Sequence, residues 1–111
     1  MNWNKLNTIE QLDEIKAESF KHPVLLFKHS TTCSISNMAL NRMERNYDQT
    51  KVGDLKPYYL DLLSHRDISS KIAEFFEVEH ESPQAILVQN GKAIYDASHY
   101  DISFADIAEK V

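Results

Sequence analysis

A continuous apolar segment, Val24 to Phe27, constrains the fold of this chain more than any other feature. Apolar residues without polar alternation are typical of a strand that is covered on both faces of a sheet. The segment follows Pro23, and a polar turn from His29 to Thr32 leads from it into an amphipathic stretch. The pattern therefore predicts a central strand that turns sharply into a helix.

Cys33, the only cysteine of the chain, stands at this corner between strand and helix. Free cysteine is often a buried and inert hydrophobe, but its neighbours here are rich in hydroxyl groups and would form a poor core wall. These neighbours are Ser30, Thr31, Thr32, Ser34 and Ser36. A helix start offers unpaired backbone N–H groups and the positive end of the dipole, which favour the thiolate. We therefore predict that Cys33 is a nucleophile in thiol chemistry.

Composition limits the domain organisation and the partners. A chain of 111 residues fits one compact domain, residues 1–111, without disulfides or a structural metal. The net charge of −5, from 12 basic and 17 acidic residues, repels nucleic acid and anionic membrane surfaces. No apolar stretch approaches the roughly 20 residues that span a bilayer, and no signal peptide is visible. We therefore expect a cytoplasmic protein whose thiol is kept reduced.

The first half of the chain predicts an edge strand and two helices around the central strand. Trp3 to Leu6 is the short edge strand, and Thr8 with Gln11 forms a capping box that opens a helix through Phe20. The apolar side of this helix comprises Ile9, Leu12, Ile15 and Phe20. After Cys33, apolar residues recur at the spacing of a second helix. They are Ile35, Met38, Ala39, Met43 and Tyr47.

The second half predicts another strand, a helix, a hairpin and a last helix. Lys56 to Leu62 is the strand, and Asp67 can cap the helix that follows. The apolar positions of that helix are Ile68, Ile72, Phe75 and Phe76. Asn90-Gly91, between strands Gln84 to Gln89 and Lys92 to Ala97, favours the type I′ turn of a hairpin. Ser103 with Asp106 opens the last helix. Its inward residues are Phe104, Ile107, Ala108 and Val111.

The resulting order is βαβαβαββα, which predicts an α/β fold with a mixed central sheet of four to five strands flanked by helices. This is the thioredoxin-like arrangement. Pro83 directly precedes the fourth strand, where a cis Ser82-Pro83 bond would leave the neighbouring backbone free to pair with an extended partner. A trans proline at the first residue of a strand is the alternative.

Four short runs of residues resemble those of the YtxJ-type monothiol bacilliredoxins. These runs are Thr32-Cys33-Ser34-Ile35-Ser36, His80-Glu81-Ser82-Pro83-Gln84, Asn90-Gly91-Lys92 and Ala97-Ser98-His99. The resemblance spans nearly the whole chain. It implies a thioredoxin-like protein in which Ser36 replaces the second active-site cysteine, and an activity that removes bacillithiol from mixed disulfides on cytosolic proteins. The family pattern has proline at the position of Ser34.

The resemblance implies a cycle with one thiol and no bound cofactor. The Cys33 thiolate attacks the bacillithiol sulfur of a bacillithiolated protein and takes the bacillithiol. Because Ser36 cannot attack sulfur, an outside thiol resets Cys33. Free bacillithiol does so most simply, and a separate reductase then reduces the bacillithiol disulfide. Residues expected to contact the thiol or the substrate are Thr32, Ser34, Ile35, Ser36, Ser82, Pro83 and His99.

Two histidines are further candidates. His29 lies four residues before Cys33 and could favour the thiolate if protonated, act as a hydrogen-bond partner, or be a solvated turn residue. His99 is expected at the same edge of the sheet as Pro83, because the last strand runs antiparallel to the one before it; a plain surface position is the alternative. The histidines lack the short paired spacing of metal ligands, so we expect no metal site.

Two other functions remain open. One is a glutaredoxin-like protein that uses glutathione or bridges an iron–sulfur cluster through Cys33 of two subunits, although the chain lacks a glycine-rich segment after the cysteine. The other is a non-catalytic binding module that receives a partner strand beside Pro83. Replacement of Cys33 by serine abolishes adduct removal in the enzyme but leaves partner binding intact in the module. Ser36→Ala is expected to have little effect, because Ser36 is assigned no resolving role.

Overall fold

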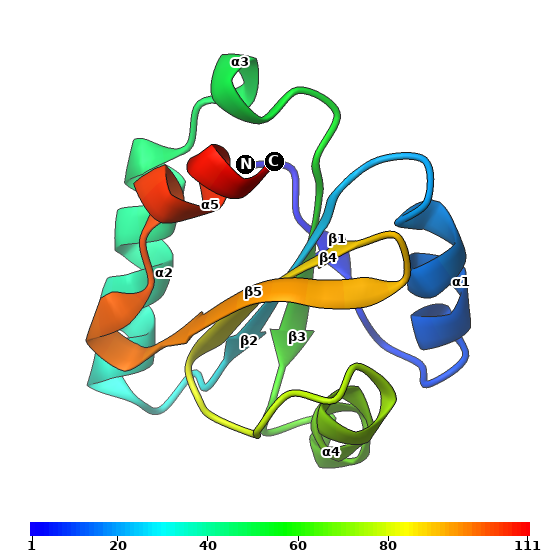
Figure 1. The fold of residues 1–111 in the computed structure, drawn as a ribbon. Helices are drawn as coiled ribbons and strands as arrows, with labels where there is room; N and C mark the ends of the chain where they lie inside the picture. The colour runs from blue at the N-terminus through cyan, green and yellow to red at the C-terminus, as the bar shows by residue number, and fades with distance from the viewer.

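The computed structural model describes all 111 residues and contains a five-stranded mixed sheet with the order β1-β3-β2-β4-β5 (Figure 1). The strands are β1 (Asn4–Lys5), β2 (Val24–His29), β3 (Lys56–Asp61), β4 (Gln84–Gln89) and β5 (Lys92–Ser98). The pairs β1–β3 and β2–β3 are parallel, and β2–β4 and β4–β5 are antiparallel. The predicted α/β fold with a mixed sheet is confirmed.

Helices cover both faces of the sheet. They are α1 (Gln11–Glu18), α2 (Ser34–Asn46), α3 (Gln49–Val52), α4 (Arg66–Phe75) and α5 (Phe104–Lys110), with a 3₁₀ turn, η1 (His99–Asp101). Figure 1 shows α2 and α5 on one side and α1 and α4 on the other. The buried apolar residues accordingly form two layers, one beneath each helix pair. The sequence patterns did not predict α3 or η1.

β2 is the centre of the sheet, as the apolar run predicts. Every one of its residues is buried, and its side chains alternate between the two layers. The strand continues past Phe27 through Lys28 and His29, which are buried although they are polar. By the same alternation Lys28 points to the side of α1 and α4, and His29 points to the side of α2 and α5.

Several predicted boundaries differ from the structure. α1 ends at Glu18 rather than Phe20, because Ser19 leaves the helix and accepts hydrogen bonds from the backbone N–H groups of Asn90 and Gly91. Phe20 is consequently 62% exposed. His65, not Asp67, is the N-cap of α4, and Asp67 lies in its first turn. There its negative charge complements the helix dipole.

Three other residues predicted to face inward are exposed. Met38 is 57% exposed, because the buried stripe of α2 runs through Ser36, Ala39 and Met43 and Met38 lies off this stripe. Ile9 precedes the first turn of α1, and Val111 follows the last residue of α5. Neither is held against the sheet by a helix.

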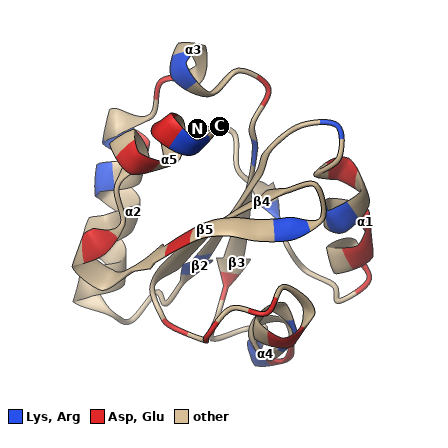
Figure 2. Ribbon diagram, in the orientation of Figure 1, with Lys and Arg blue, Asp and Glu red and all other residues tan.

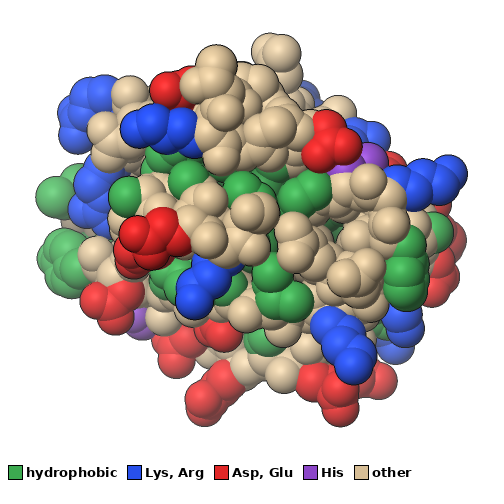
Figure 3. Space-filling view, turned by 45° about the horizontal axis from the view of Figure 1, so that its top comes forward, with side chains coloured by type: hydrophobic (Ala, Val, Ile, Leu, Met, Phe, Trp, Pro, Cys, Tyr) green, Lys and Arg blue, Asp and Glu red, His purple; other side chains and the backbone are tan.

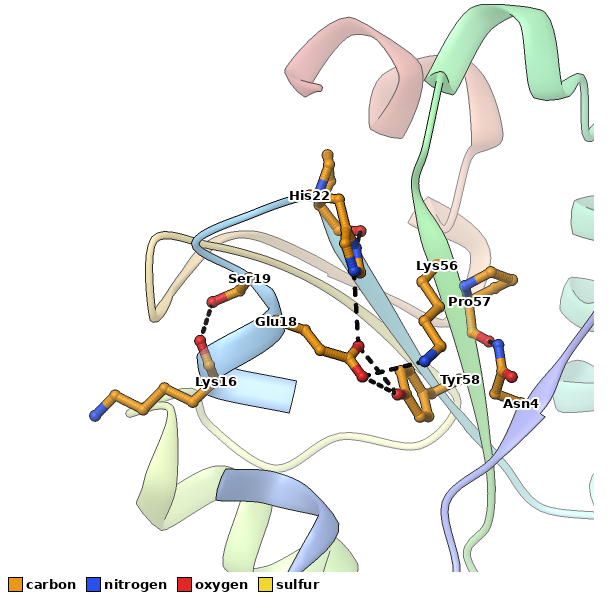
Figure 4. Close-up of polar contacts among 9 residues, drawn as sticks. Asn4, Lys16, Glu18, Ser19, His22, Lys56, Pro57 and Tyr58 are labelled. Carbon is orange, nitrogen blue, oxygen red and sulfur yellow. Dashed lines mark hydrogen bonds and ion pairs between the residues drawn. The ribbon is translucent and has the colours of Figure 1, made fainter. Parts of the chain in front are cut away.

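The hairpin and the C-terminal end of α1 meet at the end of the sheet opposite Cys33. Asn90 and Gly91 both have positive φ angles, 53° and 77°, as the predicted type I′ turn requires. Nearby, the Glu18 carboxylate accepts hydrogen bonds from Lys56 Nζ at 3.1 Å and from the Tyr58 hydroxyl at 2.9 Å (Figure 4). These contacts fix α1 to β3. No helix is long and apolar enough to cross a membrane.

Candidate active site

Cys33 is the N-cap residue of α2, at the corner where the chain leaves β2. Its backbone is extended, with φ −102° and ψ 121°, and its carbonyl accepts the N–H of Asn37 at 3.0 Å. The side chain is half-buried, and its sulfur accepts no capping hydrogen bond. The thiol therefore stands beside the unpaired N–H groups of a helix start and is open to solvent on one side.

The segment around Pro83 lies at the same edge of the sheet as Cys33. The Ser82-Pro83 bond is cis, as considered from the sequence. Lys28, near the end of β2, pairs with Gln84, which follows Pro83 directly. This register brings the start of β4 to the end of β2 from which the chain turns toward Cys33.

His99 lies beside Pro83, where the antiparallel strands predict it. Its backbone N–H donates to the Pro83 carbonyl at 3.1 Å, and its Nε2 lies 3.6 Å from a carboxylate oxygen of Glu81. Arg42 of α2 donates to the Ile102 carbonyl at 2.7 Å and so connects α2 to the segment after β5. Figure 1 shows the start of α2 and η1 side by side at this edge.

His29 and Ser36 form a buried polar pair beneath the corner. His29 is 3% exposed and Ser36 is 0% exposed, and His29 Nδ1 lies 2.6 Å from Ser36 Oγ. The same oxygen accepts the backbone N–H of Ser30 at 3.0 Å. Burial lowers the pKa of His29, although the negative charges of Asp61 and Glu44 oppose this shift. His29 is therefore a neutral, hydrogen-bonded residue of the interior and not a solvated turn histidine.

The other predicted contact residues differ in their accessibility. Thr32 and Ser34 are exposed, Ile35, Ser82 and His99 are half-buried, and Pro83 is buried. Ser36 faces the sheet, so its hydroxyl does not belong to the outer surface that a substrate meets first. The hollows of the surface lie elsewhere, and the largest lies between α1, α4 and the hairpin. A shallow edge of this kind suits a substrate that runs along it in extended form.

Lys28 is a buried residue of this edge that the sequence patterns did not single out. Its Nζ donates to His80 Nδ1 at 2.9 Å, and Ser69 Oγ lies 3.3 Å from the same nitrogen. Burial lowers the pKa of Lys28 to about 8, against the raising effect of Glu81. The pKa of His80 is also lowered, first by burial and then by the charge of Lys28. Lys28 thus supports the loop before Pro83. Its position directly after Phe27 in a central strand is the sequence feature that could have predicted its burial.

Known proteins share this architecture. The family model described as "Monothiol bacilliredoxin BrxC" matches residues 4–107. A solved structure, provisionally assigned as an oxidoreductase with a thioredoxin fold, is 34% identical with a TM-score of 0.80, and the match covers 95% of this chain and 89% of that chain.

Thioredoxins from two eukaryotes are more distant relatives in sequence. Malassezia sympodialis thioredoxin (Mala s 13) is 18% identical with a TM-score of 0.73, covering 98% of this chain and 89% of that one. Fasciola hepatica thioredoxin is 13% identical with a TM-score of 0.71, covering 96% and 94%. These two similarities show the thioredoxin fold. By its family match and its fold, this chain belongs to the monothiol bacilliredoxin BrxC family, whose thioredoxin-like architecture supports a thiol redox function.

Proposed function

We propose that this protein is a monothiol thiol-disulfide oxidoreductase that removes bacillithiol from mixed disulfides on proteins. One observation carries the proposal: the only cysteine is the N-cap residue of α2 beside the Pro83 edge, and Ser36 stands three residues later, where a second cysteine would resolve a disulfide. The family match supports thiol redox chemistry at this sulfur. The choice of bacillithiol as the thiol, and of bacillithiolated proteins as partners, is part of the proposal.

The cycle needs two exchanges of a disulfide bond. The Cys33 thiolate attacks the bacillithiol sulfur of the substrate, a new S–S bond forms, and the old one breaks with release of the protein as a thiolate, which takes a proton from solvent. A free bacillithiol thiolate then attacks the bacillithiol sulfur held on Cys33. This second exchange releases the Cys33 thiolate and bacillithiol disulfide, which a separate reductase returns to the thiol. No redox cofactor bound to the chain is required.

The backbone of Ser82 supports recognition of a protein substrate. The Pro83 carbonyl is occupied by the N–H of His99, but neither the N–H nor the carbonyl of Ser82 forms a hydrogen bond within the chain. An extended segment that passes Cys33 can pair with these two groups without displacing an existing bond. Such pairing does not read side chains, so it fits an enzyme that serves many proteins.

Intact-mass spectrometry tests the proposal. Reduced protein incubated with bacillithiol disulfide should gain one bacillithiol, and it should lose this group again when free bacillithiol is added. It should also remove bacillithiol from a modified test protein, and glutathione reagents in parallel should react at least tenfold more slowly. Cys33→Ser should abolish every one of these reactions.

The matched control places the same thiol elsewhere. The double variant Cys33→Ser/Ser70→Cys carries one exposed thiol within α4, away from a helix start. It should react no faster than a free thiol in solution. Equal activity of this variant, retained activity in Cys33→Ser, or a preference for glutathione would each contradict the proposal.

A further inference from the structure

The buried pair of His29 and Ser36 has more hydrogen-bonding capacity than its contacts use. A hydroxyl has one donor and two acceptor sites. Ser36 Oγ accepts the N–H of Ser30 and lies 2.6 Å from His29 Nδ1, which accepts the hydroxyl proton in the tautomer that carries its hydrogen on Nε2. One acceptor site of Ser36 therefore stays free. Cys33, the N-cap residue, lies three positions earlier, and its sulfur has no hydrogen-bond partner in the structure, so the relay requires its side chain to turn toward this site.

Asp61 provides a second, independent observation on the far side of His29. The two residues are register partners in the parallel pair β2–β3. One carboxylate oxygen of Asp61, Oδ2, accepts the Ser64 hydroxyl at 3.0 Å, but the other, Oδ1, is buried without a hydrogen-bond partner. A buried acceptor without a hydrogen-bond partner destabilises the folded protein, and the positive charge of an imidazolium beside it would offset this loss.

The remaining polar groups around His29 are also defined. Glu44 of α2 contributes a negative charge, and its carboxylate accepts the indole N–H of Trp3 at 2.9 Å. The ring of Tyr59 lies 5.6 Å from the imidazole, centroid to centroid. The negative charges of Asp61 and Glu44 favour a positive charge on the ring, against the larger opposing effect of burial.

We propose that Ser36 relays the proton of Cys33 to His29, an inference that rests on the proposed thiol exchange at Cys33. The thiol proton passes to Ser36 Oγ as the hydroxyl proton of Ser36 passes to His29 Nδ1. The products are a Cys33 thiolate that accepts a hydrogen bond from Ser36, and an imidazolium that faces Asp61. The numbers of protons and charges are unchanged, and the reverse transfer restores the starting state.

The relay makes Ser36 and His29 positioning residues, since neither touches the disulfide. Burial keeps His29 unprotonated at neutral pH, so its nitrogen is available to receive the proton. By thermodynamic reciprocity, ionisation of the thiol must favour protonation of His29 as much as the imidazolium favours the thiolate. This coupling is measurable without any disulfide substrate.

Alkylation kinetics provide the first test. Because the chain has one cysteine, the rate of reaction with iodoacetamide between pH 5 and 9 reports the thiolate of Cys33 alone. Ser36→Ala should slow the reaction at pH 6.5 about tenfold, because the variant lacks the hydroxyl that passes the thiol proton to His29. Ser19→Ala is the matched control, because it also removes a buried hydroxyl but at the opposite end of the molecule. An unchanged pH profile in Ser36→Ala would overturn the relay.

A double-mutant cycle read by NMR provides the second test and does not depend on the stability of Ser36→Ala alone. The ¹⁵N shifts of the His29 imidazole give its titration in the wild type, Cys33→Ser, Ser36→Ala and the double variant. Serine is a favourable N-cap, so Cys33→Ser preserves α2 while it removes the ionisable group. The His29 pKa should be lower in Cys33→Ser than in the wild type, and this difference should vanish when Ser36 is absent.

The outcomes separate the relay from the proposed function. Identical titration of His29 in the wild type and in Cys33→Ser would refute the relay, even if bacillithiol transfer were intact. Conversely, if His29 and Cys33 are coupled but the protein does not accept bacillithiol, the relay is supported and the proposed substrate is wrong.

Discussion

At the scale of single residues, Lys28 shows that a residue of the candidate site can lower the stability of the fold. Its side chain is 0% exposed, and its ammonium has one histidine nitrogen as hydrogen-bond partner. Burial lowers its pKa from 10.5 to about 8, a difference that corresponds to about 3 kcal/mol between the charged and neutral forms. Below pH 8 the folded protein therefore carries an unfavourable buried charge. The same residue holds His80 and the loop that leads to Pro83.

Lys28→Met should accordingly stabilise the protein at pH 7 by roughly 2 kcal/mol, since the apolar stem is kept and the charge is removed. The unfolded chain binds the lysine proton up to pH 10.5 and the folded chain only up to about 8, so wild-type stability should rise between these values. The advantage of Lys28→Met should shrink over the same interval. Urea unfolding at pH 7, 8 and 9.5 measures both effects.

Lys56→Met is the control, because this substitution should change the stability in the opposite direction. The pKa of Lys56 is raised, first by its hydrogen bond with Tyr58 and then by that with Glu18, so this lysine stabilises the fold while charged. Its removal should lower stability at pH 7. The interpretation of Lys28 fails if both variants shift stability in the same direction, or if Lys28→Met keeps the wild-type pH response.

At the scale of elements, the start of α2 accepts the proline that the family pattern places at Ser34. Ser34 is the first helical residue, and its N–H forms no hydrogen bond. Proline is favoured at this position of a helix, because its missing N–H is unpaired there in any case. The preceding residue, Cys33, already has the extended backbone that a following proline demands.

Ser34→Pro should therefore raise the free energy of unfolding by about 0.5 kcal/mol, mainly because the unfolded chain loses conformational freedom. Denaturant titration of the reduced protein at pH 7 measures this change. Asn37→Pro is the control one turn later, where the N–H bonds to the Cys33 carbonyl, and it should cost about 3 kcal/mol or more. A destabilised Ser34→Pro variant would show that the N–H of Ser34 has a partner in solution.

Most elements of this fold could be predicted from the sequence, but the contacts between them could not. Periodicity and capping signals were sufficient for the order of the five strands and of the helices α1, α2, α4 and α5, for the hairpin at Asn90-Gly91 and for the corner at Cys33. These signals placed the end of the central strand at Phe27, because a lysine and a histidine do not continue an apolar run. The contact of His29 with Ser36 was missed for the same reason, since it depends on β2 continuing under the first turn of α2. Position alone did not reveal that Ser36 faces inward.

At the scale of the whole molecule, chemistry and stability are separated along the sheet. Apolar layers fill both sides of β2, and the buried polar groups other than Ser19 collect near its last two residues, where the thiol lies. Acidic and basic residues are interspersed over the helices and loops (Figure 2), and the face in Figure 3 shows hydrophobic atoms between charges of both signs. On the face in Figure 3 neither charge forms a patch of its own, which fits the proposed recognition through the backbone of Ser82.

This placement of polar groups predicts how the whole fold responds to acid. Burial is the first cause of the lowered pKa of both His29 and His80. Near pH 6.5 and below, the unfolded chain therefore binds protons that the folded chain does not, and stability should fall as the pH drops from 7.5 to 5.5. The slope can reach about 1.4 kcal/mol per pH unit for the buried His29 and is smaller for His80, which is exposed, so His80→Gln should remove only this smaller share.

Urea unfolding at several pH values, at low and at high salt, decides whether burial is the cause. Desolvation acts at the buried site and is screened little by salt, whereas repulsion between surface charges is screened over about 10 Å at 0.1 M. The slope should thus persist at 0.5 M NaCl. A slope that disappears in salt would assign the acid sensitivity to the surface, and a flat profile in the wild type would show that His29 and His80 bind protons as readily in the folded chain as in the unfolded one.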